Sequence, residues 1–538
     1  MPGGLLQLVA NGQANIILTG NPTTTFFKCV YKQYTPFGLQ RFRLDYDGLR
    51  NLSFDSPTEF NFKIKRYAEM LWDTYIVVNM PDIWSPFYNI SGGCNENGLN
   101  NGYEYKWIKN LGFNMINQIT IHSGGTILAQ YSGEWMQNAV DRDETSKKEL
   151  INRMIGNVPE MYDPKQMYNN IYPNALSYLD TSKNPISPEP SIRGRKLYIP
   201  LMAWFCNSTK TSLPLIALQY QEVEIKIEFR CVKELFTIFN DKNVRKSPNS
   251  SDKSYQMWRF LQEPPLIENT CDEIKKTNDE LTKLYTNRRN DWNTDIHLMG
   301  TYIFLGDEER RVMAAQEHNI LVKTQYEWDY LDTTGSKRIE IPSRDMVSSY
   351  MWRFRRSDVN ERNEWSNYQN YDFEDSIPSG IQIATNLWCT SKRSPKNIKY
   401  IMTDMAILCG QDYRETTLDE GVYRYIEKFN RTSGISKDGL YCYNFCTNTN
   451  RNMYQPTGAQ NTNKWKHIIF EFNTIEPPKN PDETNSVEVL CDQDSGAIIG
   501  IRKNDWKLNE YNFDLRVFEE RYNVIQIIGG RVGLLCAR

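Results

Sequence analysis

Apolar and polar residues alternate with a period of two along much of the chain, which is typical of β-strands with one buried face. The alternation is clear in Phe60–Arg66, Leu71–Met80 and Leu213–Phe229. Polar loops rich in Asn, Gly and Pro separate such runs, and Gly124-Gly125 between two of them indicates a hairpin. The pattern therefore predicts an all-β protein built from short strands and long loops.

Two distant segments share one arrangement. Lys196–Phe229 and Gly439–Phe470 each contain an aromatic-rich strand, a polar connection and then strands with period-two alternation. Between them, the strand-like Thr301–Leu305 runs into Asp307–Ala315, where an acidic start predicts a short helix. We interpret the chain as two consecutive eight-stranded antiparallel β-sandwiches of jelly-roll type, joined by that helix.

The same interpretation divides the chain into an arm, two domains and a linking helix. We expect an N-terminal arm over 1–25, a first jelly roll over 26–306 with a polar insertion at about 233–292, a linking helix over 307–317 and a second jelly roll over 318–538. The first strand is expected to open at Phe26–Tyr31. Helices are predicted over Asp141–Met161 and Thr416–Asn430, where capping residues precede charged runs.

Composition and charge restrict the classes of function that the chain can have. The 538 residues include 13% aromatics and 32 Tyr, which favours strands over helix bundles. With 63 basic against 66 acidic residues and no long basic run, the charge pattern that direct nucleic-acid binding requires is missing. No apolar stretch approaches the roughly 18–20 residues of a membrane span, and the first residues lack the basic start of a signal peptide. We therefore expect folding in a reducing compartment.

The 11 cysteines fit that compartment, because they are scattered and odd in number. We predict reduced, mostly buried thiols. Cys442 and Cys446 are four residues apart and would share one face of a strand, with His467 as the nearest further ligand. A second ligand pair is not apparent, so a zinc site is disfavoured and no metal or cofactor is expected.

No sequence motif points to catalysis, since the chain contains no phosphate-binding loop, GxSxG or HExxH pattern. Asp307–Arg311 resembles an acidic–basic cluster, but a solvated helix explains it better. Trp365 and Tyr368 suit either a sugar-binding patch or packing at an interface, and we favour packing. The four histidines lie in strand-like segments and are expected to be structural: His122, His297, His318 and His467. The sequence predicts no catalytic residue and no enzyme.

Glycosylation stays open at the level of sequence. Triplets of the form Asn-x-Ser/Thr are common by chance in an Asn-rich chain, and they mark glycans only where a glycosylation machinery reaches them. They begin at Asn51, Asn89, Asn207, Asn249 and Asn430.

Seven further stretches carry a family resemblance. The opening GGLLQLVANGQANIILTGNPTTTFFKCVYKQYTPF, and then LYIPLMAWFC, LPLIALQYQEVEIKI, TYIFLGDEERRVMA, RNEWSNY, MYQPTGAQNTN and RYNVIQIIGGRVGLL, occur in order from end to end. Together they resemble the double jelly-roll major capsid proteins of nucleocytoplasmic large DNA viruses. The chain departs from that pattern with NFCT at 444–447, where the family commonly reads SFAL, and with QPTG at 455–458 in place of a Ser-Gly-rich turn.

The resemblance implies a structural protein of the virion. It implies a homotrimeric, pseudo-hexagonal capsomer, assembled in the host cytoplasm, that tiles an icosahedral shell over an internal membrane. Neighbouring capsomers and minor capsid proteins at the inner face would be its partners. The departures leave an alternative, a paralogous minor capsid protein or a lectin-like spike of the same virion. Outward loops are expected at Pro81–Asn114, Lys233–Trp292 and Asp358–Asn397.

Overall fold

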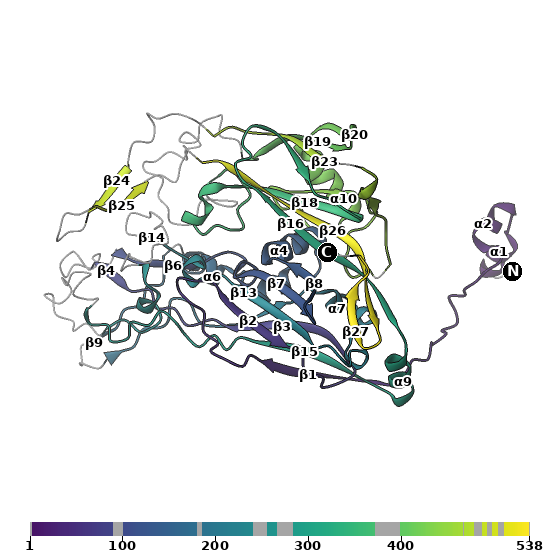
Figure 1. Cartoon of the computed structure of the whole chain (residues 1–538), viewed down its shortest axis with the longest axis horizontal. Coiled ribbons are helices and arrows are strands. Elements are labelled where there is room, and N and C mark those ends of the chain that lie inside the picture. The colour runs from purple at the N-terminus through teal and green to yellow at the C-terminus, as the bar shows by residue number, and fades with distance from the viewer. Residues whose placement is uncertain are drawn as a thin grey trace.

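The computed structural model describes residues 3–89, 101–169, 171–179, 185–239, 255–265, 283–371, 399–453, 455–465, 467–477, 487–491, 498–503 and 511–536. Two jelly rolls lie one above the other in Figure 1, and an N-terminal arm extends away from both. No described helix is long and apolar enough to cross a membrane.

The first jelly roll has two antiparallel sheets. In chain order its strands are β1 (Phe37–Asp45), β2 (Thr58–Lys63), β3 (Met70–Asn79), β7 (Ile116–Ser123), β8 (Thr126–Tyr131), β11 (Lys196–Pro200), β12 (Leu213–Pro214), β13 (Val223–Phe229) and β15 (His297–Leu305). One sheet has the order β1-β15-β3-β11, with β12 continuing beside β3, and the other has the order β2-β13-β7-β8.

The second jelly roll repeats this plan. Its strands are β16 (His318–Tyr330), β17 (Ser336–Ile341), β18 (Met346–Arg356), β19 (Met402–Cys409), β20 (Asp412–Asp419), β21 (Leu440–Asn444), β22 (Gln460–Asn461), β23 (Ile468–Thr474), β26 (Phe513–Ile528) and β27 (Arg531–Leu534). The orders are β16-β26-β18-β21, with β22 beside β18 and β27 beside β26, and β17-β23-β19-β20.

The strand orders confirm the predicted repeat. β11 pairs with β3 as β21 pairs with β18, and β13 lies between β2 and β7 as β23 lies between β17 and β19. The two segments that looked alike in sequence therefore occupy the same places in two eight-stranded jelly rolls, counting β12 and β22 with the strands that they extend and leaving out β27, which forms a hairpin with β26 after the last strand of the second roll. Following the chain, we call the eight strands of each roll B to I.

The period-two pattern explains the core of each roll. Along β13, Val223, Ile225 and Ile227 are buried, whereas Glu224 and Lys226 between them are not, because successive side chains point to opposite faces. One hydrophobic cluster fills the first roll and a second fills the other. The first cluster also includes Met351, Leu440, Cys442 and Phe518 of the second roll, so the two rolls share apolar contacts.

Helices occupy the connections. The helix predicted over Asp307–Ala315 is present as α9 (Asp307–Ala315), which follows β15 and has no buried residue. Shorter elements are α1 (Gly3–Val9), α2 (Ile16–Thr19), β4 (Phe87–Asn89), β5 (Asn101–Gly102), β6 (Glu104–Trp107), α3 (Leu111–Asn114), β9 (Tyr178–Leu179), β10 (Pro185–Ile186), α7 (Trp204–Asn207), β14 (Phe236–Phe239), β24 (Val487–Cys491) and β25 (Ile498–Lys503).

Three predicted elements were wrong in extent or type. Phe26–Tyr31 is no strand: it is exposed and unpaired within the described chain, and β1 begins only at Phe37. The single helix predicted over Asp141–Met161 is three helices, α4 (Gly133–Asp143), α5 (Lys148–Met154) and α6 (Pro159–Tyr162). Pro159 begins the last of them, because proline fits the first turn of a helix but not its interior.

The helix predicted over Thr416–Asn430 begins later. Thr416–Asp419 belong to β20, where Leu418 and Asp419 pair with β19 and the two threonines lie at an irregularity of the register, and a strand suits two β-branched threonines. A π-helical turn over Val422–Ile426 and α10 (Glu427–Arg431) follow. The segment therefore changes from strand to helix after Asp419.

The long connections gather at one end of the molecule. Those after strand D and strand H of the first roll carry β4, β6 and β14, which lie at the end opposite the arm in Figure 1. About half of the three predicted outward loops, including most of Asp358–Asn397, falls outside the described residues. The described parts of the D–E and H–I connections of the first roll lie at the same end of the molecule.

Candidate functional site: the junction between the jelly rolls

Helix α4 lies between the two rolls and is the centre of their junction (Figure 1). It begins after strand F of the first roll, where the Ser132 side chain caps it by accepting a hydrogen bond from the Trp135 amide at 3.1 Å. All eleven residues of α4 are buried, although its sequence is polar. A buried polar helix needs partners for its charges, and the second roll supplies them.

Glu134, in the first turn of α4, faces three arginines of the second roll. Its Oε2 accepts hydrogen bonds from Arg353 Nη2 of β18 at 3.1 Å and from Arg516 Nη1 of β26 at 2.9 Å. Arg355 Nη1 lies 3.7 Å from Oε1. Burial alone would raise the pKa of Glu134, but the three guanidinium groups outweigh it and hold the pKa well below its ordinary value.

Arg142, in the last turn of α4, forms a second buried cluster. Its guanidinium is fully buried, 2.7 Å from Asp143 Oδ2 and 3.0 Å from Glu520 Oε1 of β26. Asp143 in turn accepts a hydrogen bond at 2.5 Å from Thr449 of the second roll. Burial favours a neutral Asp143, yet Arg142 lowers the pKa of this carboxyl below its ordinary value.

The charged partners of α4 lie on one face of a sheet. Arg353 follows Trp352 on β18, and Glu520 is three residues from Val517 on β26, so Trp352 and Val517 point the other way, into the core of the second roll. The outward face of β18 and β26 therefore carries the charges that α4 needs. Buried ion pairs add little net stability over apolar packing, but an unmatched partner is costly, so the two clusters favour a single orientation of the rolls.

The segment Arg362–Tyr368 forms the seam beside α4. Asn363 Nδ2 donates to the carbonyl oxygens of Lys233 and Phe236, each at 2.8 Å, and Trp365 Nε1 donates to the Glu234 carbonyl at 3.0 Å. Trp365 is 9% exposed, with the Arg230 guanidinium 4.3 Å from its ring centre.

Tyr368 is 1% exposed, and its hydroxyl donates to Asn138 of α4 at 3.0 Å. The packing interpretation of Trp365 and Tyr368 is therefore confirmed. The rings tie the rolls together and are not open to a sugar.

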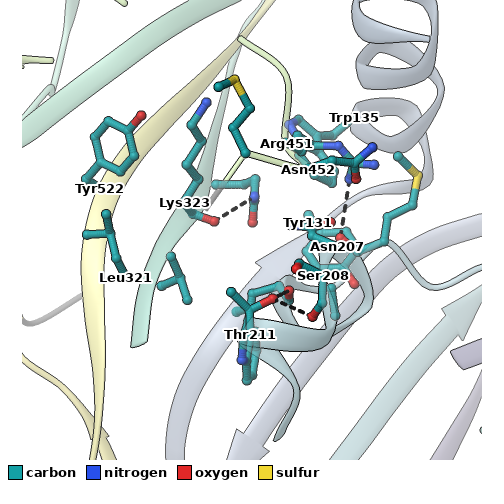
Figure 2. A pocket seen from close by; sticks show the side chains of 17 residues that line it. Tyr131, Trp135, Asn207, Ser208, Thr211, Leu321, Lys323, Arg451, Asn452 and Tyr522 are labelled. Carbon is teal, nitrogen blue, oxygen red and sulfur yellow. Dashed lines mark hydrogen bonds between the residues drawn. The ribbon is translucent and has the colours of Figure 1, made fainter. Parts of the chain in front are cut away.

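A cavity of about 40 Å³ lies at the same junction (Figure 2). Tyr131, Trp135 and Asn207 line it from the first roll, whereas Lys323 and Arg451 line it from the second. Arg451 donates to the Met202 carbonyl at 3.4 Å, and its guanidinium lies 5.5 Å from the Trp135 ring centre. The volume suits one or two waters and no larger ligand.

The histidines are dispersed and locally bonded. His297 Nδ1 lies 2.6 Å from the Asp295 carbonyl and His318 Nε2 lies 2.8 Å from the Met313 carbonyl. His122 Nε2 is 3.4 Å from Glu224, and His467 contacts Glu340. Burial lowers the pKa of His297. The described residues contain no group of three or more His, Cys, Asp or Glu suited to a metal ion.

The other sequence candidates lie apart from the junction or within its packing. Asp307–Arg311 forms the exposed first turns of α9, with Arg310 3.4 Å from Glu69. Cys442 lies on β21 and Cys446 beyond its end, both buried as free thiols. The thiols described as free are Cys29, Cys206, Cys231, Cys409, Cys442, Cys446 and Cys536.

The triplets for glycosylation differ in surroundings. Asn430 is exposed, whereas Asn51 is partly buried and donates to Asp291 at 2.8 Å. Asn207 lines the junction cavity. The side chains of Asn89 and Asn249 lie outside what the structure describes. Asn430 is therefore the most exposed of the described asparagines in these triplets.

Reasoning from the sequence missed the charged residues of the junction. Glu134, Asn138 and Arg142 follow one another at spacings of four residues, so on a helix they share one face. Such a spacing is a signal for a common contact. A polar helix of this kind is more often solvated, so only the burial of α4 identifies the partners.

Comparisons with known proteins agree with this architecture. A family model described as the major capsid protein N-terminus matches residues 25–259. Probable capsid protein 4 of Acanthamoeba polyphaga mimivirus is 30% identical over 239 residues, which is 44% of this chain and 40% of the relative. The major capsid protein of Paramecium bursaria Chlorella virus 1 is 22% identical over 552 residues, which covers 100% of both chains.

The solved structures support the fold. The quasi-atomic structure of the PBCV-1 virus capsid covers 96% of this chain and 100% of its own, with a TM-score of 0.60 and 15% identity. The chain spans 40–58% of the length of four relatives from the mimivirus, Chrysochromulina ericina virus and Phaeocystis pouchetii virus. From the strand orders and these matches together, the chain is similar to the double jelly-roll major capsid proteins of nucleocytoplasmic large DNA viruses.

Proposed function

We propose that this chain is a structural subunit of an icosahedral viral shell and carries no catalytic activity. Three copies would form a capsomer whose six jelly rolls lie in a near-hexagonal ring, and such capsomers would tile the shell. The observation that carries the proposal is the repeated strand order of the two rolls, held in one orientation by the buried junction around α4. A rigid pair of similar lobes is the unit that three-fold symmetry turns into a hexagon.

The ends of the rolls suggest how the subunit would stand in the shell. The D–E and H–I connections lie at one end and the arm leaves from the other, beside α9 (Figure 1). We place the connections outward and the arm at the inner base. Minor capsid proteins and a membrane layer beneath the shell would then meet the base, while any glycans would sit on outward loops.

We further propose that the division between the rolls lies at 306–317, around α9. The helix has no buried residue and separates β15 from β16, the last strand of one roll and the first of the next. Limited proteolysis tests this division. Fragments that separate near residue 235 instead would contradict it.

The proposed function is tested by the purified protein alone. Light scattering should give three times the 63.1 kDa mass of one chain, and negative-stain images should show hexagonal outlines that pack into sheets. A monomer that binds glycans would instead support the alternative of a spike or minor capsid protein. Labelling within infected cells should place the chain in cytoplasmic assembly sites and in virions.

A further inference from the structure

The F–G connections of the two rolls occupy equivalent places but differ in burial. In the first roll this connection begins with α4, which is covered entirely by the second roll of the same chain. In the second roll it is the segment Gly421–Ser436, which contains the π-helical turn and α10. The described residues of one chain contain no third roll that could cover it.

The inner side of Gly421–Ser436 is firmly attached to its own roll. Tyr423 is 1% exposed and donates to the Met405 carbonyl at 3.0 Å. Lys428 is buried, and its Nζ donates to the Leu440 carbonyl at 2.6 Å. The segment is therefore held in place, and its outer side is a formed surface.

That outer side is apolar. Tyr425 is 49% exposed, Ile426 is 55% exposed and Phe429 is 88% exposed. We call these three side chains the F–G patch. Large apolar side chains gathered in this way mark an interaction surface more often than chance exposure does.

The surface that would receive the F–G patch follows from the repeat. Within the chain, α4 packs on the outward face of the second roll's sheet β16-β26-β18-β21, and β8 lies beside β16. The equivalent sheet of the first roll is β1-β15-β3-β11. We call its outward face the B–I–D–G face.

The B–I–D–G face also exposes apolar side chains. Tyr198 is 41% exposed and alternates along β11 with Leu197 and Ile199, which are in the core. On β1, the counterpart of β16, Phe37 is 57% exposed and Leu39 is 49% exposed. Both halves of a second junction are thus present on each chain, but on opposite sides of the molecule, so only another copy can bring them together.

We infer that the F–G patch of one copy docks on the B–I–D–G face of the next copy and repeats the internal junction between chains. This inference rests on the proposed trimer and specifies its contact surface. The two surfaces differ, so the contact is head-to-tail, and it closes into a ring when three internal and three intermolecular junctions have similar geometry.

Single substitutions on the two surfaces test the inference. Phe429→Asp and Tyr198→Asp should each abolish the trimer in sedimentation velocity at concentrations where the unmodified protein is fully trimeric. Leu331→Asp is the matched control, because Leu331 is 77% exposed and belongs to neither surface. It should leave the trimer intact. Ile426→Asp serves as a second F–G variant should Phe429→Asp fail to give a cooperative melt.

Mixing adds a result that a general loss of stability would not give. The Phe429→Asp chain keeps its B–I–D–G face, and the Tyr198→Asp chain keeps its F–G patch. Together they should form 1:1 dimers and stop there, whereas each alone stays monomeric. Dimers of either variant alone would overturn the head-to-tail geometry.

Footprinting of the unmodified protein requires no substitution. The trimer should protect Tyr425 and Phe429 from carbene labelling relative to the dissociated chain. Trimers that persist in both F–G variants, or full labelling of both residues within the trimer, would overturn this contact while leaving the trimer itself in place. Unmodified protein that is monomeric at every concentration would instead refute the proposed function.

Discussion

Glu134 and Arg353 belong to different jelly rolls and meet in a buried ion pair, with 3.1 Å between Glu134 Oε2 and Arg353 Nη2. Their side chains are 5% and 2% exposed. The pair links the first turn of α4 to strand D of the second roll, 219 residues later. The relative orientation of the lobes thus depends on charges that neither lobe satisfies alone.

Replacing Glu134 with Gln should destabilise the junction strongly. The amide keeps the shape of the side chain but leaves Arg353, Arg355 and Arg516 without their shared carboxylate. Removing one partner of a buried pair costs roughly 3–5 kcal/mol. Chemical denaturation with circular dichroism should show that loss, either as a lower midpoint or as separate unfolding of the two rolls.

A surface ion pair provides the control for that variant. Glu149 lies 2.6 Å from Arg153 on α5, with both side chains at least 70% exposed. Glu149→Gln should leave the midpoint unchanged, because exposed pairs contribute little. Equal effects of Glu134→Gln and Glu149→Gln would show that the buried cluster does not hold the rolls together.

Acid should weaken the junction through the same carboxylates. The pKa values of Glu134 and Asp143 are lowered in the folded protein: burial opposes the shift, but the neighbouring arginines outweigh it. A lowered pKa gives stability that is complete above the unfolded value of about 4 and is lost as pH falls through the folded value. The free energy of unfolding should therefore decline below about pH 4.5.

Other carboxyl groups have raised pKa values, so acid changes stability through them in the opposite direction. Their contribution must be separated from that of Glu134 and Asp143. Burial raises the pKa of Glu327 and Glu519, so their protonation on acidification favours the folded state. Comparing denaturation of the unmodified protein with Asp143→Asn between pH 3 and pH 7 isolates the junction. The variant should lose less stability over this range, and parallel curves would contradict the assignment.

The cysteines should differ sharply in reactivity. Burial raises the pKa of Cys206 and of Cys231 to about 12 and that of Cys442 to about 11, which keeps these thiols protonated near neutral pH. Cys29 is exposed in the segment between the arm and β1. Brief alkylation of native protein should label Cys29 first, as read by peptide mass spectrometry.

The same experiment tests the redox state of the chain. Alkylation after denaturation without reductant should modify all 11 cysteines, since none is expected in a disulfide. A pair that becomes reactive only after reduction would contradict that expectation. Native labelling of Cys442 at the rate of Cys29 would contradict the burial of the junction.

The repeated fold was predictable because alternation reports a half-buried strand directly. β13 and β23 are examples, with every second residue buried in both. Phe26–Tyr31 has a similar apolar content, yet it forms no strand, because a strand also requires a neighbour to pair with and that neighbour is not encoded locally. Whether an apolar segment forms a strand therefore depends on a pairing partner in the sheet, which the composition of the segment does not specify.

The junction was not predictable for the same reason. Glu134 lies outside the helix predicted over Asp141–Met161 and Arg142 lies at its start, whereas their partners on β18 and β26 are more than 200 residues away in sequence. A local pattern cannot distinguish a charged helix in water from one buried against a charged sheet. Trp365 and Tyr368 were easier, since aromatic side chains favour packing wherever they lie.

The N-terminal arm should be needed for assembly more than for folding. Its apolar side chains, including Leu8, Ile17 and Leu18, are 70%, 85% and 89% exposed, and Figure 1 shows the arm extending away from both rolls. Ordering such a segment costs conformational entropy that contacts within the chain do not offset. It is best explained by docking onto a neighbouring capsomer or an inner-face protein.

Deleting residues 1–20 should therefore leave a soluble trimer that melts cooperatively at the temperature of the full chain. The core of each roll stays complete, because no residue of α1 or α2 is buried. Shell formation, followed by electron microscopy of particles, should fail or lose its attachment to the layer beneath. A truncated chain that cannot fold or trimerise would place the arm in the core, and normal particles would show that it has no role in assembly.

Replacing Leu8 and Ile17 with Ser in the full-length chain separates the two explanations for a failed shell. Loss of assembly in this variant attributes the defect to the apolar contacts, whereas normal assembly attributes it to the length of the arm.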